Sequence, residues 1–357
     1  NNVILHVCRT LDAEARTQAG LYLPQLALPI PAEVHRNYTQ LLATDDYPPC
    51  YRVIPTLGKL TTHSWMTALQ TERLEQKTEA IAQRVQQFEG SWEEAAFATL
   101  ARNFGFGVNG EAFEVWAHHL PLQQTAHHRD SLFQTEAIFM GQAGLLYPET
   151  VPQHYREKAL SDDYFIRLSN EYHYLAHKFD LQPMDGDQWK FLRLRPQNFP
   201  YIRISQLARL YVERKASLSE LTELESIADF NHRLRVGTSP YWETHYVFGS
   251  ETSHRTKTLS ASSIQLLLIN TVAPLLFAYG QHIQKEALCQ RAFDLLEKLK
   301  AENNHIVRLW QEVGLAVENA GDSQALIQLK RQYCDHKDCL RCRFGYEYLK
   351  SRPSTPL

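Results

Sequence analysis

Three cysteines and a histidine stand within nine positions near the carboxyl end of the chain. They are Cys334, His336, Cys339 and Cys342, in the sequence Cys-Asp-His-Lys-Asp-Cys-Leu-Arg-Cys. Thiolate sulfur and imidazole nitrogen are ligands for soft and borderline metal ions, and structural zinc takes four of them in a tetrahedron. We therefore predict a structural metal site, with zinc as the favoured ion, that fastens the carboxyl-terminal tail to the rest of the protein.

The sequence leaves open which metal ion binds and which residue is its fourth ligand. His336 or the distant Cys289 could complete a zinc site. The spacing C-x4-C-x2-C also matches the ligand run of plant-type ferredoxins, but that run needs a further cysteine downstream and none follows Cys342. An iron-sulfur cluster is therefore less favoured than zinc, and free buried thiols are the remaining alternative.

A second group of residues that could do chemistry is the basic run 189–203, which has four cations and no acid. The cations are Lys190, Arg193, Arg195 and Arg203. Cations bind phosphates and the interleaved aromatic rings can stack on bases, so the run predicts binding of single-stranded nucleic acid. In the alternative, the apolar side chains enter the core while the arginines pair with acids or lie at the carboxyl ends of helices.

The other histidines and the acids form no recognisable catalytic motif. The pairs His118-His119 and His127-His128 are adjacent, so on a helix their side chains diverge by about 100° and cannot chelate one ion together. The sequence has no phosphate-binding glycine loop, no HExxH and no GxSxG. A metal-dependent hydrolase built from scattered histidines and acids is a minor alternative, and enzymatic activity stays open. The acids that occur singly include Asp130, Glu136, Glu171, Asp185, Asp187 and Glu243.

The composition is that of a chain that folds throughout. The 357 residues are 44% hydrophobic and 22% charged, and the formal charge of −3 gives no general attraction to nucleic acid or membrane. The remaining cysteines, Cys8, Cys50 and Cys289, are scattered, unlike those of a small secreted disulfide scaffold. No signal peptide is recognisable at the start of the sequence. We therefore expect a cytoplasmic protein.

Hydrophobic periodicity predicts the elements that position these residues. Strands are predicted at Val3–Val7 and Tyr51–Pro55. Helical spacing begins at Ser64 and stops at Gly90, and Ser91 with the acid three residues later predicts the start of the next helix. Further helices are predicted at about 110–119, 130–145, 161–179, 203–215, 217–233, 261–300, 303–318 and 323–335.

Two apolar stretches need a separate interpretation. The aromatic and β-branched run Tyr241–Gly249 predicts a strand that pairs with the amino-terminal ones. The stretch Ile264–Gly280 is interrupted by polar residues and is shorter than the roughly 20 residues that span a bilayer, so a buried helix is predicted instead. The fold class is thus mainly α. A large multi-helix body (61–330) follows the remnant of an α/β module (1–60) and precedes a Cys-rich tail (331–357) packed on the body.

Long blocks of the sequence, in order, resemble a bacterial family known as domain of unknown function 2851. The blocks are Leu132–Leu146, Trp189–Arg203, Tyr241–Gly249, Ile269–Gly280 and Leu329–Gly345. The resemblance implies an additional segment before the present amino terminus, with acids arranged as in the PD-(D/E)XK nucleases that cleave phosphodiesters with a divalent cation. The chain lacks that segment, so we expect it to be inactive alone. The resemblance includes Cys334, Cys339 and Cys342, whereas His336 is not part of the family motif.

Together these features predict a nucleic-acid-associated protein with a structural metal site. In the alternative, the chain is a non-enzymatic helical interaction or scaffold module, and the arginines of the basic run form internal ion pairs.

Overall fold

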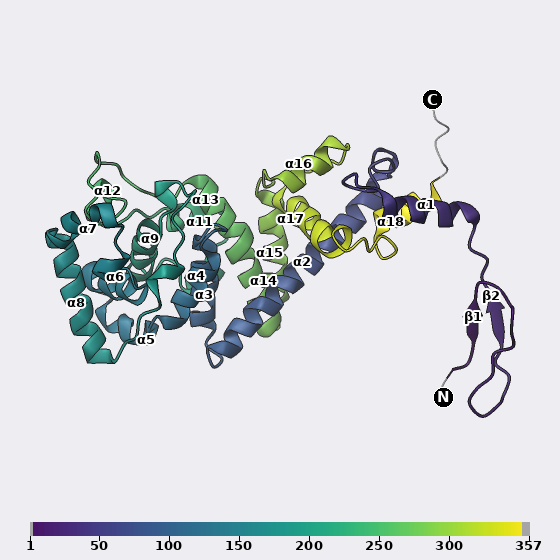
Figure 1. Cartoon of the computed structure of the whole chain (residues 1–357), viewed down its shortest axis with the longest axis horizontal. Helices are drawn as coiled ribbons and strands as arrows, with labels where there is room; N and C mark the ends of the chain where they lie inside the picture. The colour runs from purple at the N-terminus through teal and green to yellow at the C-terminus, as the bar shows by residue number, and fades with distance from the viewer. Residues whose placement is uncertain (1–2, 352–357) are drawn as a thin grey trace. The chain divides into compact units, whose positions relative to one another are not determined.

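The computed structural model describes residues 3–351, and these are mostly α-helical with two short strands near the amino end (Figure 1). The predicted fold class, mainly α, is therefore confirmed. The chain divides into two compact units. The first unit contains the residues up to Arg73 together with those from Ala301 onward, and the second unit contains Leu74–Lys300.

The first unit contains the two strands and the terminal helices. Its elements are β1 (His6–Cys8), β2 (Gln25–Ala27), α1 (Ala32–Ala43), the 3-10 helix η1 (Ile54–Thr56), the first part of α2 (Lys59–Gln87), α16 (His305–Glu312), α17 (Ala320–Gln328), the π-helical turn η7 (Leu329–Cys334) and α18 (Arg343–Lys350). The strands β1 and β2 pair in parallel, with Val7 opposite Leu26. Both side chains are exposed, so the strand pair forms no hydrophobic core of its own.

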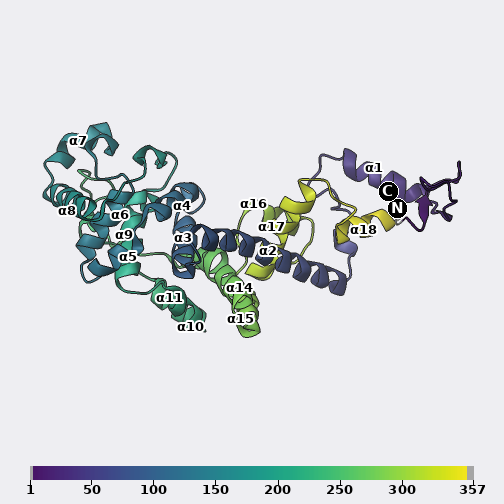
Figure 2. The same ribbon diagram turned by 90° about the horizontal axis from the view of Figure 1, so that it is seen from below.

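Helices α1 and α18 join the two stretches of chain that make up the first unit. They lie side by side in Figures 1 and 2. The side-chain amide of the buried Asn37 in α1 donates to the carbonyls of Leu349 and Ser351, at 3.1 and 2.9 Å. These carbonyls are at the carboxyl end of α18, where a helix has no intrahelical donors left. The amide therefore caps α18 while fixing it to α1.

Aromatic rings fill the core of the first unit. The Trp310 ring contacts those of Tyr47 and Phe344, with centroids 6.3 and 5.9 Å apart, and Trp65 meets Tyr333 edge to face at 5.4 Å. The same buried cluster contains three of the six cysteines. The core thus packs sulfur atoms among large rings contributed by both stretches of chain.

The second unit is a helical body. Its elements after α2 are α3 (Trp92–Phe104), α4 (Gly110–His119), α5 (Leu122–Thr125), η2 (Ala126–His128), α6 (Leu132–Gln142), η3 (Pro148–Thr150), α7 (Gln153–Leu160), α8 (Asp163–Phe179), η4 (Gly186–Gln188), η5 (Pro196–Asn198), α9 (Pro200–Val212), α10 (Leu218–Glu223), α11 (Ile227–Leu234), α12 (Tyr241–Thr244), α13 (Ala261–Leu267), the π-helical η6 (Leu268–Val272), α14 (Ala273–His282) and α15 (Glu286–Lys298). The predicted cap is confirmed, since the Ser91 hydroxyl accepts from the backbone N–H of Glu94 at the start of α3.

A buried carboxyl group lies at the centre of this body. Glu136 of α6 has no exposed surface, and it accepts hydrogen bonds from the Tyr164 hydroxyl at 2.8 Å and from Trp242 Nε1 at 2.7 Å. Burial raises the pKa of Glu136, and the hydrogen bonds from its neighbours oppose that rise. The group thus links three helices, α6, α8 and α12, through fully satisfied polar contacts.

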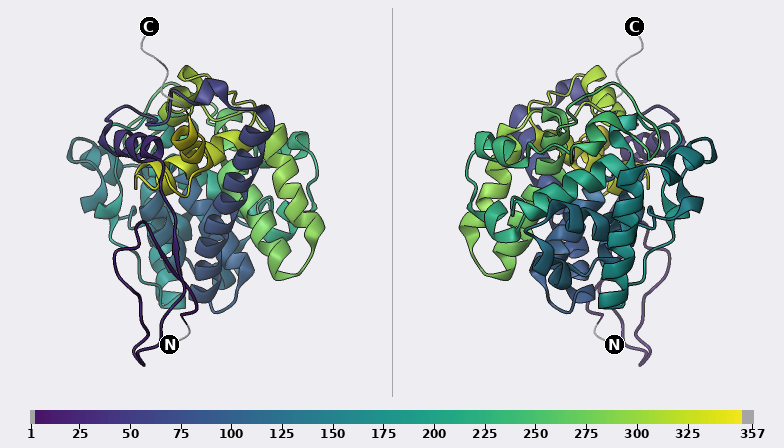
Figure 3. Two further views of the ribbon diagram at one scale, coloured as in Figure 1. Left: turned by 90° about the vertical axis from the view of Figure 1, so that its right-hand side faces the viewer. Right: turned by 90° about the vertical axis from the view of Figure 1, so that its left-hand side faces the viewer.

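The predicted single long helix at 261–300 is instead two antiparallel helices, the continuous run Ala261–His282 and α15. The run Ala261–His282 contains the π-helical turn η6, and a reversal at Gln284, where φ is 54°, sends α15 back along α14. This hairpin can be followed in green in Figures 1 and 3. Ala261–His282 is long and apolar enough to cross a membrane, but 67% of its most apolar window is buried inside the protein, as predicted for a core helix.

The predicted strand Tyr51–Pro55 is wrong. Successive turn hydrogen bonds, from Val53 N to the Cys50 carbonyl at 3.0 Å and from Thr56 N to the Val53 carbonyl at 2.9 Å, lead into η1. The two prolines before Cys50 and the proline inside η1 favour such turns, because proline fixes φ and has no N–H to donate to a sheet.

The predicted strand Tyr241–Gly249 is also wrong. Its first part is the short helix α12, and Trp242 lies fully buried with its indole bonded to Glu136. The rings of Tyr241 and His245 stack at 4.0 Å, one helical turn apart. Aromatic residues favour strands only on average, and here the packing of the rings determines a helical turn.

Candidate functional site

Four cysteine side chains of the first unit line one small cavity, which we call the cysteine cavity. They are Cys50, Cys334, Cys339 and Cys342. The volume of the cavity is about 10 Å³, which corresponds to a single water-sized sphere. Three of the four were predicted from their spacing, and the structure brings them together with a fourth cysteine from the other end of the sequence.

Two backbone turns position the three carboxyl-terminal thiols. Cys334 is the last residue of η7, and its carbonyl accepts from Lys337 N at 3.0 Å, where the chain reverses with a φ of 52°. The Cys339 carbonyl then accepts from Cys342 N at 3.3 Å. The first turn begins at Cys334, and the second has Cys339 and Cys342 at its two ends; all three side chains line the cavity.

Gly345 allows helix α18 to begin directly against this loop. A Cβ atom at Gly345 would lie 2.2 Å from the carbonyl oxygen of Cys339, a separation that no side chain tolerates. Cys342 is the N-cap of α18, and the backbone amides of Phe344 and Gly345 point toward its sulfur, which favours a thiolate there.

All four thiols have raised pKa values. Burial raises the pKa of Cys334 to about 12 and that of Cys342 to about 11, and the neighbouring sulfurs add to both increases. Burial also raises the pKa of Cys339, and it raises that of Cys50 well above the ordinary value. Without a cation, the four groups therefore hold their protons at neutral pH. A metal ion reverses this preference, because coordination deprotonates a thiol.

Three buried polar groups beside the cysteine cavity have no hydrogen-bond partner within the described part of the chain. They are Tyr47 Oη, Trp65 Nε1 and Trp310 Nε1. Trp310 lines the cavity, the Tyr47 ring packs against Trp310, and the Trp65 ring packs against Tyr333, which also lines the cavity. Buried N–H and O–H groups are normally paired, and metal-bound sulfurs accept such bonds. The surroundings of the cavity therefore fit sulfur atoms that carry negative charge.

The thiols do not yet form a coordination shell. Among residues 3–351, no group of three or more His, Cys, Asp or Glu side chains is arranged to hold a metal ion. A cysteine sulfur moves by rotation about a single side-chain bond, so the four thiols can change their distances without a change in the backbone.

Neither residue predicted as fourth ligand lies at the cavity. His336 is exposed, and its side chain is absent from the cavity lining. Cys289 belongs to α15 in the second unit, where its Sγ donates to the Phe277 carbonyl at 3.6 Å. Cys50 lines the cavity instead. No spacing in the sequence connects Cys50 to the carboxyl-terminal cysteines, so only its residue type could have indicated it.

Three of the four cations in the predicted basic run are exposed. Lys190, Arg193 and Arg195 lie on the surface of the second unit, and within the described residues none of them forms an ion pair with a carboxylate. Arg193 and Arg195 are thus not buried against acids, in contrast to the alternative prediction.

Arg203 is not part of this surface. Its side chain belongs to a residue only 4% exposed, and its guanidinium donates to Gln206 Oε1 at 2.8 Å and to Asn198 Oδ1 at 2.5 Å. The group also lies over the Phe106 ring, 4.4 Å from its centroid, and burial lowers its pKa to about 10. Amide oxygens accept from both terminal nitrogens of the guanidinium, and the group is buried, so Arg203 belongs to the core and not to the exposed surface.

Two of the four aromatic residues of the basic run, Trp189 and Tyr201, are buried as well, whereas Phe191 and Phe199 are half-buried. Trp189 donates from Nε1 to the Ala143 carbonyl at 2.7 Å, and Tyr201 stacks on Trp242 with centroids 5.4 Å apart. Both residues are at most 5% exposed, so neither ring offers a face to a nucleic-acid base.

Comparison with known proteins identifies a family without an assigned activity. The family model described as "Protein of unknown function (DUF2851)" matches residues 1–305. No curated protein and no solved structure matches the chain. The matched residues include Cys50 and the whole second unit, and they end before the carboxyl-terminal cysteines. The chain belongs to the DUF2851 family.

Proposed function

We propose that the first unit is a metal-binding module in which the cysteine cavity holds one zinc ion. The observation that carries this proposal is the convergence of four thiols from two distant stretches of sequence on a cavity of about 10 Å³. Rotation of the side chains would bring the sulfurs to about 2.3 Å from a common centre, the usual zinc-sulfur distance.

The chemistry of the donors favours zinc. Four sulfur ligands in a tetrahedron suit zinc or iron, and the cavity has room for one ion rather than for a cluster of several metal atoms. The orphaned groups of Tyr47, Trp65 and Trp310 would then donate to the sulfurs and share their charge.

The role that we propose for the ion is structural. A site closed by four protein sulfurs has no open position for water or substrate, unlike catalytic zinc sites. The ion would cross-link the turn at Cys50 to the loop that precedes α18. Its binding free energy would add directly to the stability of the first unit.

Elemental analysis tests this proposal on protein purified without chelators and without a metal-affinity column. We expect about one zinc per chain, as one closed site requires, and loss of that zinc in Cys339→Ser. Cys8→Ser is the matched control, because Cys8 lies in β1 of the same unit and does not line the cavity. If iron is found instead of zinc, the site exists but holds iron. If no metal is bound, the proposal is contradicted and the four cysteines are free thiols.

A second candidate function is contact with nucleic acid through Lys190, Arg193 and Arg195. It is supported by the exposure of these three cations without carboxylate partners among the described residues. Trp189 and Tyr201 of the run are buried, and Phe191 and Phe199 pack against each other with centroids 5.4 Å apart, so we propose contact with phosphates without base stacking.

Fluorescence anisotropy with single-stranded and duplex DNA and RNA at low salt tests the second candidate. Replacing the three exposed cations with glutamine should weaken binding. For single strands, it should also reduce the slope of log affinity against log salt concentration by about 2. The control replaces three exposed cations elsewhere in the second unit, Lys158, Arg235 and Lys285. Equal affinity of both triple variants would favour the scaffold alternative.

A further inference from the structure

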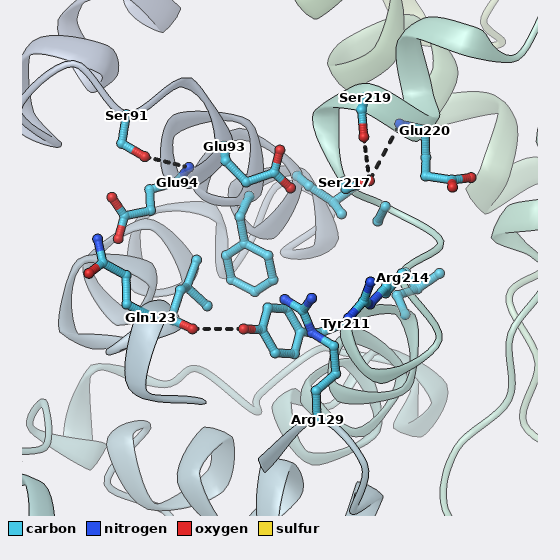
Figure 4. Close-up of a pocket in the computed structure, with 15 residues that line it drawn as sticks. Ser91, Glu93, Glu94, Gln123, Arg129, Tyr211, Arg214, Ser217, Ser219 and Glu220 are labelled. Atoms are coloured by element: carbon cyan, nitrogen blue, oxygen red, sulfur yellow. Dashed lines mark hydrogen bonds between the residues drawn. The ribbon is translucent and has the colours of Figure 1, made fainter. Parts of the chain in front are cut away.

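A pocket of about 560 Å³ lies within the second unit (Figure 4). It is formed by the first turns of α3, the start of α5, the end of α9 and the segment that leads into α10. Its volume is in the range of pockets that bind small molecules. The apolar part of its lining consists of Phe97, Leu100, Leu122, Leu210 and Ala216.

Charges of both signs line this pocket without neutralising one another. Arg129 and Arg214 lie beside Tyr211, whereas Glu93 and Glu94 belong to the first turn of α3 (Figure 4). Within the part of the chain that the structure describes, none of these four groups is within ion-pair distance of an opposite charge. Glu93 and Arg214 are exposed, and Glu94 and Arg129 are half-buried, so these charges are accessible to a ligand.

The arginine side of the pocket is preorganised. The Tyr211 hydroxyl donates to the Leu122 carbonyl at 2.7 Å, which fixes the ring, and the guanidinium of Arg129 lies over that ring, 4.2 Å from its centroid. Arg129 Nε is buried and has no hydrogen-bond partner among the described residues. A stacked guanidinium with a free donor is suited to bind a carboxylate or a phosphate.

A backbone hydrogen bond positions one carboxylate on the glutamate side of the pocket. Glu93 Oε2 accepts from the backbone N–H of Leu218 at 3.0 Å, which holds the carboxylate at the wall of the pocket. Glu94 follows it on the first turn of α3, where the helix dipole favours anions. Each carboxylate keeps an oxygen that can accept a hydrogen bond from an ammonium group.

We propose that this pocket binds a small zwitterion. Its anionic group, a carboxylate or a phosphate, would contact Arg129 and Arg214, and its ammonium group would contact Glu93. The apolar lining would cover the body of the molecule between the two charges. A ligand of this kind supplies a counter-charge to both sides of the pocket, whereas a simple anion would leave the glutamate side without one.

Isothermal titration with the full chain tests the proposal. The probes are the dipeptide Leu-Leu and O-phosphoethanolamine, which supply the carboxylate and the phosphate versions of the ligand. N-acetyl-Leu-Leu lacks the ammonium group and Leu-Leu-amide lacks the carboxylate. We expect one zwitterion to bind, and removal of either of its charges to weaken binding about tenfold or more, because each charge forms a charge-assisted hydrogen bond.

Variants assign each end of the probe to its side of the pocket. Arg214→Gln should weaken Leu-Leu about tenfold but leave Leu-Leu-amide unchanged, and Glu93→Gln should weaken Leu-Leu but leave N-acetyl-Leu-Leu unchanged. Arg214 is exposed and Arg195→Gln is the matched control outside the pocket. The proposal is overturned if inorganic phosphate alone binds as tightly as the zwitterions, if no probe binds, or if the pocket variants behave as the control does.

Discussion

Cys50 and Cys342 stand near opposite ends of the sequence, and their side chains line the same cavity. Both residues are buried, at 6% exposure each, within a core that also contains Trp310 and Phe344. The two thiols thus occupy positions where an ion would connect the stretch before α2 with the loop before α18.

The fourth ligand can be assigned by comparing Cys50→Ser with His336→Ala. We expect Cys50→Ser to lose at least about 100-fold in zinc affinity, because second-shell changes alone cost about 10–100-fold. His336→Ala should retain the ion, since His336 is exposed and does not line the cavity. Competition with a chromogenic chelator measures both affinities. Zinc loss in His336→Ala with retention in Cys50→Ser would contradict the assignment.

Zinc binding should release protons. The pKa values of Cys334 and Cys342 are raised to about 12 and about 11, so both thiols are protonated at pH 7 in the metal-free protein. Coordination requires thiolates, and we expect about four protons per ion from the four sulfurs. The affinity should therefore rise with pH up to the pKa values of the thiols. Titration calorimetry in buffers with different ionisation enthalpies counts the protons, and release of fewer than about two would contradict four-sulfur ligation.

Gly345→Ala should damage the cysteine loop specifically. The added methyl group would lie 2.2 Å from the Cys339 carbonyl oxygen, so α18 or the loop must shift. We expect a loss of about 1–3 kcal/mol in the free energy of unfolding of the first unit, together with weaker zinc binding. Gly58→Ala is the control in the same unit, because its Cβ would meet no atom within 4 Å. Equal stability of the two variants in urea unfolding would refute the expected clash.

The buried Glu136 gives a pH dependence whose sign follows from its raised pKa. Burial raises the pKa of Glu136, so the native state holds the proton more tightly than the unfolded chain does. In the unfolded chain, glutamate has a pKa of about 4.3. The contribution of this group to stability is therefore complete below that pH and is lost as the pH rises, by up to about 1.4 kcal/mol per pH unit.

Glu136→Gln removes this titration. We expect the stability advantage of the wild type over the variant to shrink as the pH rises above about 4.3, as measured by urea unfolding at a series of pH values. The exposed Glu149→Gln serves as control and should show no such trend. Glu136→Ala should cost more than Glu136→Gln, by about 1–3 kcal/mol, because it leaves Tyr164 and Trp242 without acceptors.

Local sequence signals predicted much of the helical fold. The predicted helix at 110–119 is α4, Gly110–His119, and the predicted cap at Ser91 begins α3. Apolar residues at helical spacing and a hydroxyl at the N-cap act over a few residues, so their effect can be derived from the sequence alone. The strand predicted at Tyr241–Gly249 failed for the opposite reason, because its aromatic rings pack against helices that are distant in the sequence.

The candidate site was predictable only in part. The spacing of Cys334, Cys339 and Cys342 pointed to their convergence, whereas Cys50 joins them through the tertiary packing of the first unit. The burial of Arg203 had a local signal, since its partner Gln206 is three residues away on the same helix. A hydrogen-bond donor and an acceptor three residues apart on a helix indicate an internal contact. The prediction of Arg203 as a phosphate-binding cation did not take this contact into account.

The division of the first unit between the two ends of the sequence affects how the protein is made. Helix α1 and the Cys50 turn leave the ribosome long before α16, α17 and α18, whose side chains they contact. The second unit can fold while these early residues still wait for their partners. Premature termination after the second unit would therefore leave the apolar residues around Leu41 and Cys50 uncovered, and such a fragment should be a target for chaperones and proteases.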